Sequence, residues 1–207
     1  MKYSTLLLTC FLFCSLKSQG QDTIRLANPS FEEATDWENK IPGWTSCGPW
    51  QAPQPTLKPG NFEVDKLASD GANYLALVVR DDNIMESVSQ QLPVSFLEGQ
   101  VYRLHVDLMR AELFLMESST KNQKVNYATP VKLQIWGSND HCEKQELLYT
   151  TPLITTTRWL SYTLEFTPQQ GDYNYLILQT APKTPVLFPY NGHVLIDNLV
   201  LTTLDNK

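Results

Sequence analysis

The sequence predicts an all-β protein built as an antiparallel β-sandwich or barrel. Along most of the chain, apolar and polar residues alternate with a period of two, as they do in strands that have one buried face. Clusters of Gly, Asn and Asp separate the alternating runs. The chain has 207 residues, of which 42% are hydrophobic and 18% are charged. It therefore has enough apolar material for a packed core and is neither disordered nor fibrous.

Six segments are expected to form the main strands. The alternating runs are residues 101–110, 131–136 and 159–166, and the shorter, more continuously apolar runs are residues 74–79, 173–179 and 194–201. Turn signals such as Asp70-Gly71 and Asn191-Gly192 bound these runs. Only residues 94–98 and parts of 111–120 have a pattern compatible with a short helix. Many short strands with almost no helix favour a single domain of this length.

Two long irregular stretches interrupt the strands. Residues 40–62 contain five prolines and two tryptophans, and residues 111–130 are polar in their middle. Loops of this length within a compact domain are usually functional or mobile, so both are candidate contact surfaces.

The first twenty residues have the pattern of a secretory signal peptide. Lys2 precedes an apolar run over residues 6–16, and Ser18-Gln19-Gly20 supplies small residues for cleavage before Gln21. The alternative is acylation at Cys10 or Cys14, but neither follows the small residue that a lipoprotein signal requires. We therefore expect residues 1–20 to be removed and residues 21–207 to form one exported domain, which is periplasmic, at the cell surface or secreted.

The charge of the chain is acidic. The net charge is −6, and it becomes −8 once Lys2 and Lys17 leave with the signal peptide. Proteins that bind nucleic acids usually carry a basic excess that neutralises phosphates, so this class is excluded. No segment is apolar for long enough to span a membrane.

Two cysteines, Cys47 and Cys142, remain in the exported chain. An even pair in an oxidising compartment predicts a disulfide bond. Two free buried thiols are the alternative. Neither cysteine has a second thiol or a spaced histidine pair nearby, so a metal site at these residues is not expected.

Several motifs follow one another in the order found in a known group of modules. They are Leu26-Ala27-Asn28-Pro29-Ser30-Phe31-Glu32-Glu33, Pro42-Gly43-Trp44, Asp70-Gly71-Ala72-Asn73-Tyr74-Leu75-Ala76-Leu77 and Val194-Leu195-Ile196-Asp197-Asn198-Leu199. Together they resemble the jelly-roll carbohydrate-binding modules of families four, nine and twenty-two, which have a galactose-binding-domain-like fold. The segments around Cys47 and Cys142 are closer to a variant found in secreted and surface proteins of Bacteroidetes. The resemblance covers nearly all of residues 21–207 and implies a jelly-roll sandwich, whereas a fold alone does not carry a function.

The resemblance also implies a structural calcium ion where the first and last strands meet. Glu32 and Asp197 would be its ligands, and backbone carbonyls would complete the shell. Calcium prefers such hard oxygen ligands. The alternative is that Glu32 ends a turn and that Asp197 accepts backbone hydrogen bonds.

Outward-facing residues on two predicted strands are the first candidates for a ligand site. Sugars are bound by aromatic faces and by polar groups that reach their hydroxyls. Arg103 and His105 on one strand, with Gln134 and Trp136 on another, would line one groove if the two strands were neighbours. Trp136 is the most informative, because a tryptophan on the polar side of a strand needs something to cover it. The alternative is a loop, such as residues 111–128, folded over its ring.

Arg80 and Trp50 complete the candidate set. Arg80 ends a strand where the resembled modules often carry an arginine that contacts sugar, and the alternative is a salt bridge to Asp81, Asp82 or Glu86. Trp50 lies in the proline-rich loop, where its ring would form a platform at the rim or pack beside Cys47.

No established catalytic motif is present. The sequence lacks a G-x-S-x-G elbow, an H-E-x-x-H helix, a phosphate-binding glycine loop and a C-x-x-C pair. Glycoside hydrolysis needs only two carboxylates at the right separation, and Asp107 with Glu86 or Glu165 would be the available pair. We expect a non-catalytic protein that binds a glycan or surface polysaccharide. The alternative is a cell-surface or envelope module that contacts a protein through residues 40–62 and 111–130.

Overall fold

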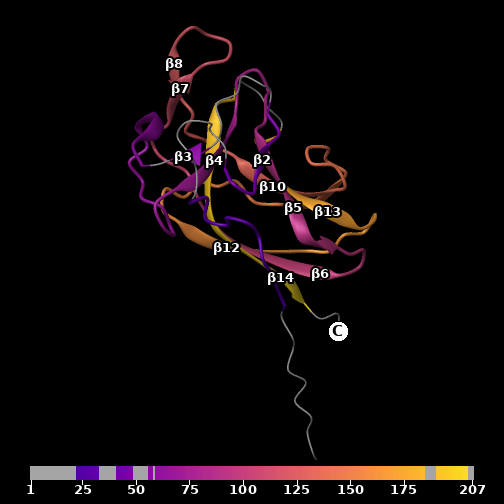
Figure 1. Cartoon of the computed structure of the whole chain (residues 1–207). Coiled ribbons are helices and arrows are strands. Elements are labelled where there is room, and N and C mark those ends of the chain that lie inside the picture. The colour runs from indigo at the N-terminus through magenta and orange to yellow at the C-terminus, as the bar shows by residue number, and fades with distance from the viewer. Residues whose placement is uncertain (1–21, 33–40, 49–55, 58, 185–189, 205–207) are drawn as a thin grey trace, which may run out of the picture.

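The computed structural model of the protein describes residues 22–32, 41–48, 56–57, 59–184 and 190–204 (Figure 1). The predicted signal peptide, with the alternative acylation sites Cys10 and Cys14, lies outside the described residues, and so does Trp50. Within the described ranges, no helix is long and apolar enough to cross a membrane.

The strands form two sheets that pack face to face, which confirms the predicted antiparallel β-sandwich. The larger sheet has the order β12-β6-β14-β4-β3, and β1 and β9 also pair with β14. Its strands are β1 (Thr23–Ile24), β3 (Thr56–Leu57), β4 (Tyr74–Val79), β6 (Val101–Met109), β9 (Thr129–Pro130), β12 (Leu160–Phe166) and β14 (Gly192–Leu204). The smaller sheet has the order β11-β10-β13-β5-β2, formed by β2 (Thr45–Ser46), β5 (Ser87–Phe96), β10 (Lys132–Ser138), β11 (Glu146–Thr150) and β13 (Tyr173–Ala181).

Two short elements lie outside these sheets. Strands β7 (Leu115–Glu117) and β8 (Lys124–Asn126) form a hairpin at the top of the view in Figure 1, and η1 (Asn61–Glu63) is a single 3-10 turn. The short helices expected in residues 94–98 and 111–120 are not formed. The former segment continues β5, because Phe96 pairs with Tyr173 and is buried in the core. In the latter, Leu115–Glu117 pair with β8.

The main hydrophobic core lies between the two sheets. It is built from alternate positions of the strands, which are Leu75, Leu77, Leu104, Val106, Val194 and Ile196 in the larger sheet and Val88, Leu133, Ile135, Leu176 and Leu178 in the smaller one. These are the faces that the period-two alternation predicts to be buried. The side chains between them therefore point away from the core, toward the outer face of each sheet.

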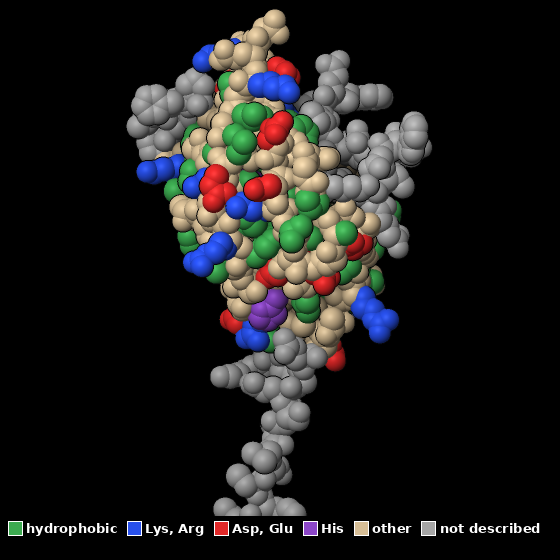
Figure 2. Space-filling model, turned by 90° about the vertical axis from the view of Figure 1, so that its left-hand side faces the viewer, with side chains coloured by type: hydrophobic (Ala, Val, Ile, Leu, Met, Phe, Trp, Pro, Cys, Tyr) green, Lys and Arg blue, Asp and Glu red, His purple; other side chains and the backbone are tan. Residues whose placement is uncertain are grey.

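A second hydrophobic cluster covers the outer face of the larger sheet. Tyr74, Ala76 and Val78 point outward from β4 and pack against side chains of the loops, among them Val64, Phe114, Met116 and Tyr127. Strand β4 is continuously apolar in the sequence because both of its faces are buried. On the side of the molecule shown in Figure 2, charged side chains of both signs surround small hydrophobic areas.

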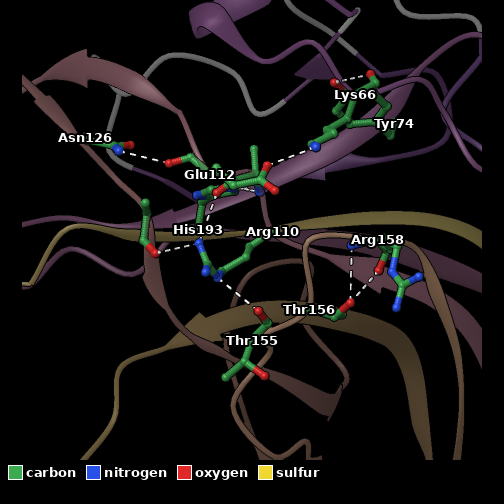
Figure 3. Close-up of polar contacts among 11 residues, drawn as sticks. Lys66, Tyr74, Arg110, Glu112, Asn126, Thr155, Thr156, Arg158 and His193 are labelled. Atoms are coloured by element: carbon green, nitrogen blue, oxygen red, sulfur yellow. Dashed lines mark hydrogen bonds and ion pairs between the residues drawn. The ribbon is translucent and has the colours of Figure 1, made fainter.

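His193 attaches this cover to the sheet. Its imidazole is fully buried, Nε2 accepts a hydrogen bond of 2.8 Å from the Ala111 N–H, and Nδ1 donates one of 2.7 Å to the Tyr127 carbonyl (Figure 3). A ring with one donor and one acceptor nitrogen is neutral. Burial lowers the pKa of His193 to about 4, although the hydrogen bond to Tyr127 partly raises it.

We expect the contribution of His193 to the free energy of unfolding to be lost as the pH falls from about 6.5 to about 4. The unfolded chain binds a proton at His193 over this range and the folded chain does not, so the contribution is complete above pH 6.5 and falls by on the order of 3 kcal/mol by pH 4. Urea unfolding at a series of pH values measures this loss. His193→Gln keeps a donor and an acceptor but cannot titrate, so the stability of the wild-type protein relative to this variant should fall as the pH falls from about 6.5 to about 4, and a difference that does not change with pH would contradict the assignment.

The predicted disulfide between Cys47 and Cys142 is present, with Cα atoms 5.3 Å apart and a sequence separation of 95 residues. Cys47 directly follows β2, at one edge of the smaller sheet, whereas Cys142 belongs to the loop that joins β10 and β11, the two strands at the other edge. Because the core fills the inner face, the β10–β11 loop reaches Cys47 on the outer side of β13 and β5. The disulfide therefore holds this loop against the outer face.

Replacing both cysteines, as Cys47→Ser with Cys142→Ser, should destabilise the protein by about 4–5 kcal/mol. A bond that closes a loop of this length removes conformational entropy from the unfolded chain. Chemical denaturation without reductant measures the difference, and the wild-type protein with reductant should match the double variant. Equal stability of the oxidised protein and the variant would show that the bond does not constrain the unfolded chain.

Candidate ligand-binding face

Trp136 and Gln134 lie on the outer face of the smaller sheet. Both belong to β10, where they alternate with Leu133 and Ile135, which are fully buried in the main core. The side chains of Trp136 and Gln134 are half-buried. The prediction that these two residues point away from the core is therefore confirmed.

The register of the sheet extends this face across four strands. Trp136 pairs with Ile177, Ile177 with Ser89, and Ser89 with Thr45, so these side chains form one row. The neighbouring row consists of Gln134, Gln179 and Ser87. We refer to these seven residues as the outer row face. It combines an indole ring with amide and hydroxyl groups.

Three buried polar atoms on the outer row face have no hydrogen-bond partner among the residues that the structure describes. They are Nε1 of Trp136 and the hydroxyl oxygens of Ser87 and Ser89. Both serines are only 1% exposed. Buried polar groups are almost always paired in native proteins, and an unpaired one costs about 1–3 kcal/mol. All three lie in two neighbouring rows of one sheet face, with β13 between Trp136 and the serines, and this face is a place where polar partners are missing.

A cover lies over part of this face. Ile177 points outward and yet is fully buried, and Gln179 is nearly so. The disulfide brings the β10–β11 loop to this side of the sheet. Lys144 of the same loop is partly buried, and burial lowers the pKa of its ammonium group. The face is thus a polar layer beneath a tethered loop, and not an open surface.

Arg103 and His105 do not join this face, which corrects the prediction of one shared groove. Both lie on β6 in the larger sheet, so the main core separates them from Trp136. Arg103 forms an ion pair of 2.6 Å with Glu165, and Nδ1 of His105 lies 3.0 Å from the Thr163 hydroxyl. Alternation identifies the outward side of a strand correctly, but it does not tell which sheet the strand joins.

Arg80 is buried and forms an ion pair of 2.5 Å with Glu86. Glu86 also accepts a hydrogen bond from the Val78 N–H. This contact is one of the salt bridges that the sequence offered as the alternative, and it joins the residue after β4 to the residue before β5. Trp50, the remaining candidate, lies outside the described residues.

Residues 111–128 do not cover Trp136. Phe114, Met116 and Tyr127 of this segment pack in the second cluster, on the larger sheet. That alternative for Trp136 is therefore wrong. The hydrophobic side chains of the segment pack against the outer side of β4, which is apolar. The outer face of the smaller sheet is more polar and offers less apolar surface to such side chains.

Glu32 and Asp197, the predicted calcium ligands, both accept backbone hydrogen bonds. Glu32 Oε1 accepts two of 2.8 Å and Asp197 accepts three of 2.7–2.9 Å, from the N–H groups of Ala72, Asn73, Ser69, Asp70 and Asn198. Burial raises the pKa of Asp197 to about 6, and these N–H groups partly lower it. The two carboxylates therefore fix segment 69–73.

These contacts do not fit a calcium ion held between Glu32 and Asp197. Calcium takes six to eight oxygen ligands, whereas the groups that point at these carboxylates are N–H donors. The described part of the chain also has no group of three or more His, Cys, Asp or Glu residues that could hold a metal ion. The contacts favour the alternative role of Asp197, which is to accept backbone hydrogen bonds. Calcium binding stays a prediction.

Ser87, Ser89 and Gln179 are members of the face that the sequence did not identify. A weak signal exists, because Ser87-Val88-Ser89 alternates hydroxyl and apolar side chains as an exposed strand does. Serine is common on such surfaces, however, and nothing in the sequence shows that the two share a sheet face with Trp136. The strand register supplies that information.

Ser87→Ala and Ser89→Ala should each stabilise the free protein by about 1 kcal/mol, because each removes a buried hydroxyl that has no partner. Thermal and urea denaturation measure the change. Ser161→Ala is the matched control, since the Ser161 hydroxyl donates to Asp107 at 2.5 Å and its loss should not stabilise. Destabilisation by both test variants would mean that the hydroxyls are paired.

No protein-family model matches the sequence, and no curated protein is significantly similar to it. Solved structures with a similar fold do exist. A cyclase from Fischerella sp. TAU in complex with 4-(1H-indol-3-yl)butan-2-one superposes with a TM-score of 0.61 and 15% identity, over 90% of this chain and 99% of the cyclase chain. The arabinose-bound α-L-arabinofuranosidase MgGH51 gives a TM-score of 0.53 and 12% identity, over 87% of this chain and 26% of that chain.

A carbohydrate-binding module is also among the similar structures. The CBM22-1 and GH10 modules of Clostridium thermocellum xylanase 10B, complexed with xylohexaose, give a TM-score of 0.50 and 10% identity, over 88% of this chain and 29% of that chain. The resemblance to family-22 modules is thus confirmed for the fold. At these identities the comparisons establish the sandwich alone, and they include both a binding module and enzymes.

Proposed function

We propose that the protein binds a glycan at the outer row face without catalysing a reaction on it. The observation that carries the proposal is the group of three unpartnered polar atoms on one face of the sheet, Nε1 of Trp136 on β10 and the hydroxyls of Ser87 and Ser89 on β5, with β13 between them. A sugar ring presents an apolar C–H face and a rim of hydroxyls. The indole of Trp136 would stack on the former, while the side chains of Ser87, Ser89, Gln134 and Gln179 would pair with the latter.

The chemistry of the face favours a neutral sugar and a non-catalytic role. None of the seven residues of the outer row face is Asp or Glu, whereas hydrolysis of a glycosidic bond uses a pair of carboxylates. The carboxylates considered from the sequence lie elsewhere. Asp107 and Glu165 are on the larger sheet, and Glu86 is paired with Arg80.

Entry of a glycan requires the cover to shift. The hydroxyl oxygens of Ser87 and Ser89 are closed to solvent, while the Trp136 and Gln134 side chains are partly accessible. A ligand would therefore first contact Trp136 and Gln134 and then displace the cover. The disulfide limits how far the β10–β11 loop moves, because it fixes Cys142 to the edge strand β2.

The proposed place of action is outside the cytoplasm. Disulfide bonds persist in oxidising compartments, and the Cys47–Cys142 bond agrees with export. The envelope or the cell exterior also offers polysaccharides. The xylanase module of the same fold was solved with xylohexaose, so neutral β-linked pentose and hexose chains are the first ligands to test.

A broad glycan array probed with purified protein identifies the ligand class, and calorimetric titration then gives the affinity. We expect Trp136→Ala to weaken binding at least tenfold, because it removes the stacking surface. Trp136→Phe keeps an aromatic face and should retain most of the affinity. The melting temperature should change little in either variant, since Trp136 belongs to neither hydrophobic cluster.

Three outcomes would contradict the proposal. They are a folded protein that binds no glycan, full binding by Trp136→Ala, and unfolding of that variant together with normal binding by Gln134→Ala. The first outcome would favour the alternative, an envelope interaction module that contacts a protein through residues 111–130.

A further inference from the structure

A separate cavity lies on the opposite side of the sandwich from Trp136. It has a volume of about 440 Å³ and is lined by residues 65–68, Met109 and residues 157–159. Met109 ends β6, and residues 157–159 lead into β12, so the cavity opens over the larger sheet. Pockets that bind small ligands have volumes of roughly 300–1,000 Å³.

Two aromatic side chains hold one wall of this cavity in place. The Trp159 indole N–H donates to the Leu67 carbonyl at 2.8 Å, and the Tyr74 hydroxyl donates to the Lys66 carbonyl at 3.1 Å. The two rings also meet edge to face, with centroids 5.7 Å apart. Leu67 is 77% exposed, so its apolar side chain is held in solvent by a fixed backbone, beside the Trp159 ring. The cavity therefore has an apolar surface whose backbone is already fixed in the free protein.

The charged groups around the cavity differ in whether they are paired. Lys66 points at Glu112 and forms an ion pair of 2.9 Å with it, as Figure 3 shows. Arg158 extends away from its backbone in the same view, and within the described part of the chain neither Arg158 nor Asp65 forms an ion pair. One guanidinium and one carboxylate are thus available to a ligand at the rim of the cavity.

We propose that this cavity binds an acidic sugar, a pyranose ring that carries a carboxylate. Arg158 would bind the carboxylate with its guanidinium fork, which matches carboxylate geometry better than an ammonium group does. Trp159 and Leu67 would pack against the C–H face of the ring. Asp65 would accept hydrogen bonds from ring hydroxyls, which an aromatic acid without hydroxyls does not offer.

The test is a titration of the ¹⁵N-labelled protein with D-glucuronate, followed by NMR. The indole N–H of Trp159, assigned with Trp159→Phe, and the Nε–H of Arg158 should shift in a saturable manner. D-Glucose at the same concentrations should leave both signals in place. Arg158→Gln should weaken glucuronate binding at least tenfold, and its amide spectrum shows whether it remains folded.

Arg103→Gln is the matched control, because it removes the same charge from the larger sheet outside the cavity, and it should bind glucuronate normally. The proposal is overturned if glucuronate shifts neither signal, if glucose or benzoate binds as tightly, or if Arg158→Gln binds normally. Trp136→Ala should retain glucuronate binding. A failure of the cavity to bind glucuronate can therefore be told apart from a failure of the outer row face to bind a glycan.

Discussion

Burial of the two inner sheet faces against each other is the interaction on which the rest of the structure depends. It requires an apolar residue at every second position of the long strands, and in doing so it fixes which side chains face outward. On the larger sheet much of the outer side is again apolar and is covered by loops attached at His193. On the smaller sheet the outer side is a row of indole, amide and hydroxyl groups. The outer face of the larger sheet is therefore mainly packed against apolar side chains of loops, whereas the outer face of the smaller sheet is mainly polar.

The polar outer face of the smaller sheet contains groups that lower the stability of the free protein. Two serine hydroxyls and an indole N–H are buried without partners, although alanine or valine at the same strand positions would remove the cost. The Cys47–Cys142 disulfide holds a loop on the same side of the sheet. Groups that cost free energy in the free protein and lie together are most simply explained by a ligand that pairs with them, and a glycan offers both the hydroxyls and the apolar ring face.

The sequence predicts the strands, the disulfide and the outward direction of Trp136 well, because the strands and this direction follow from local alternation, and the disulfide follows from an even pair of cysteines in a chain that is expected to be exported. It does not predict which strands become neighbours. Arg103 and Trp136 have equivalent patterns but lie on different sheets, since the pairing of strands depends on contacts distant in the chain. The same limit hides Ser87 and Ser89, which become informative only when the registers of β5, β13 and β10 place them on the same sheet face as Trp136. Segment 111–128 has the length of a functional loop, yet much of its apolar content packs on β4.

The most direct test of the central claim is a crystal structure of the protein with the glycan that the array selects. We expect a sugar bound with one ring stacked on Trp136, with hydroxyls hydrogen-bonded to Ser87 and Ser89 and the β10–β11 loop displaced. A glycan bound elsewhere, with both serine hydroxyls still buried and unpartnered, would contradict it.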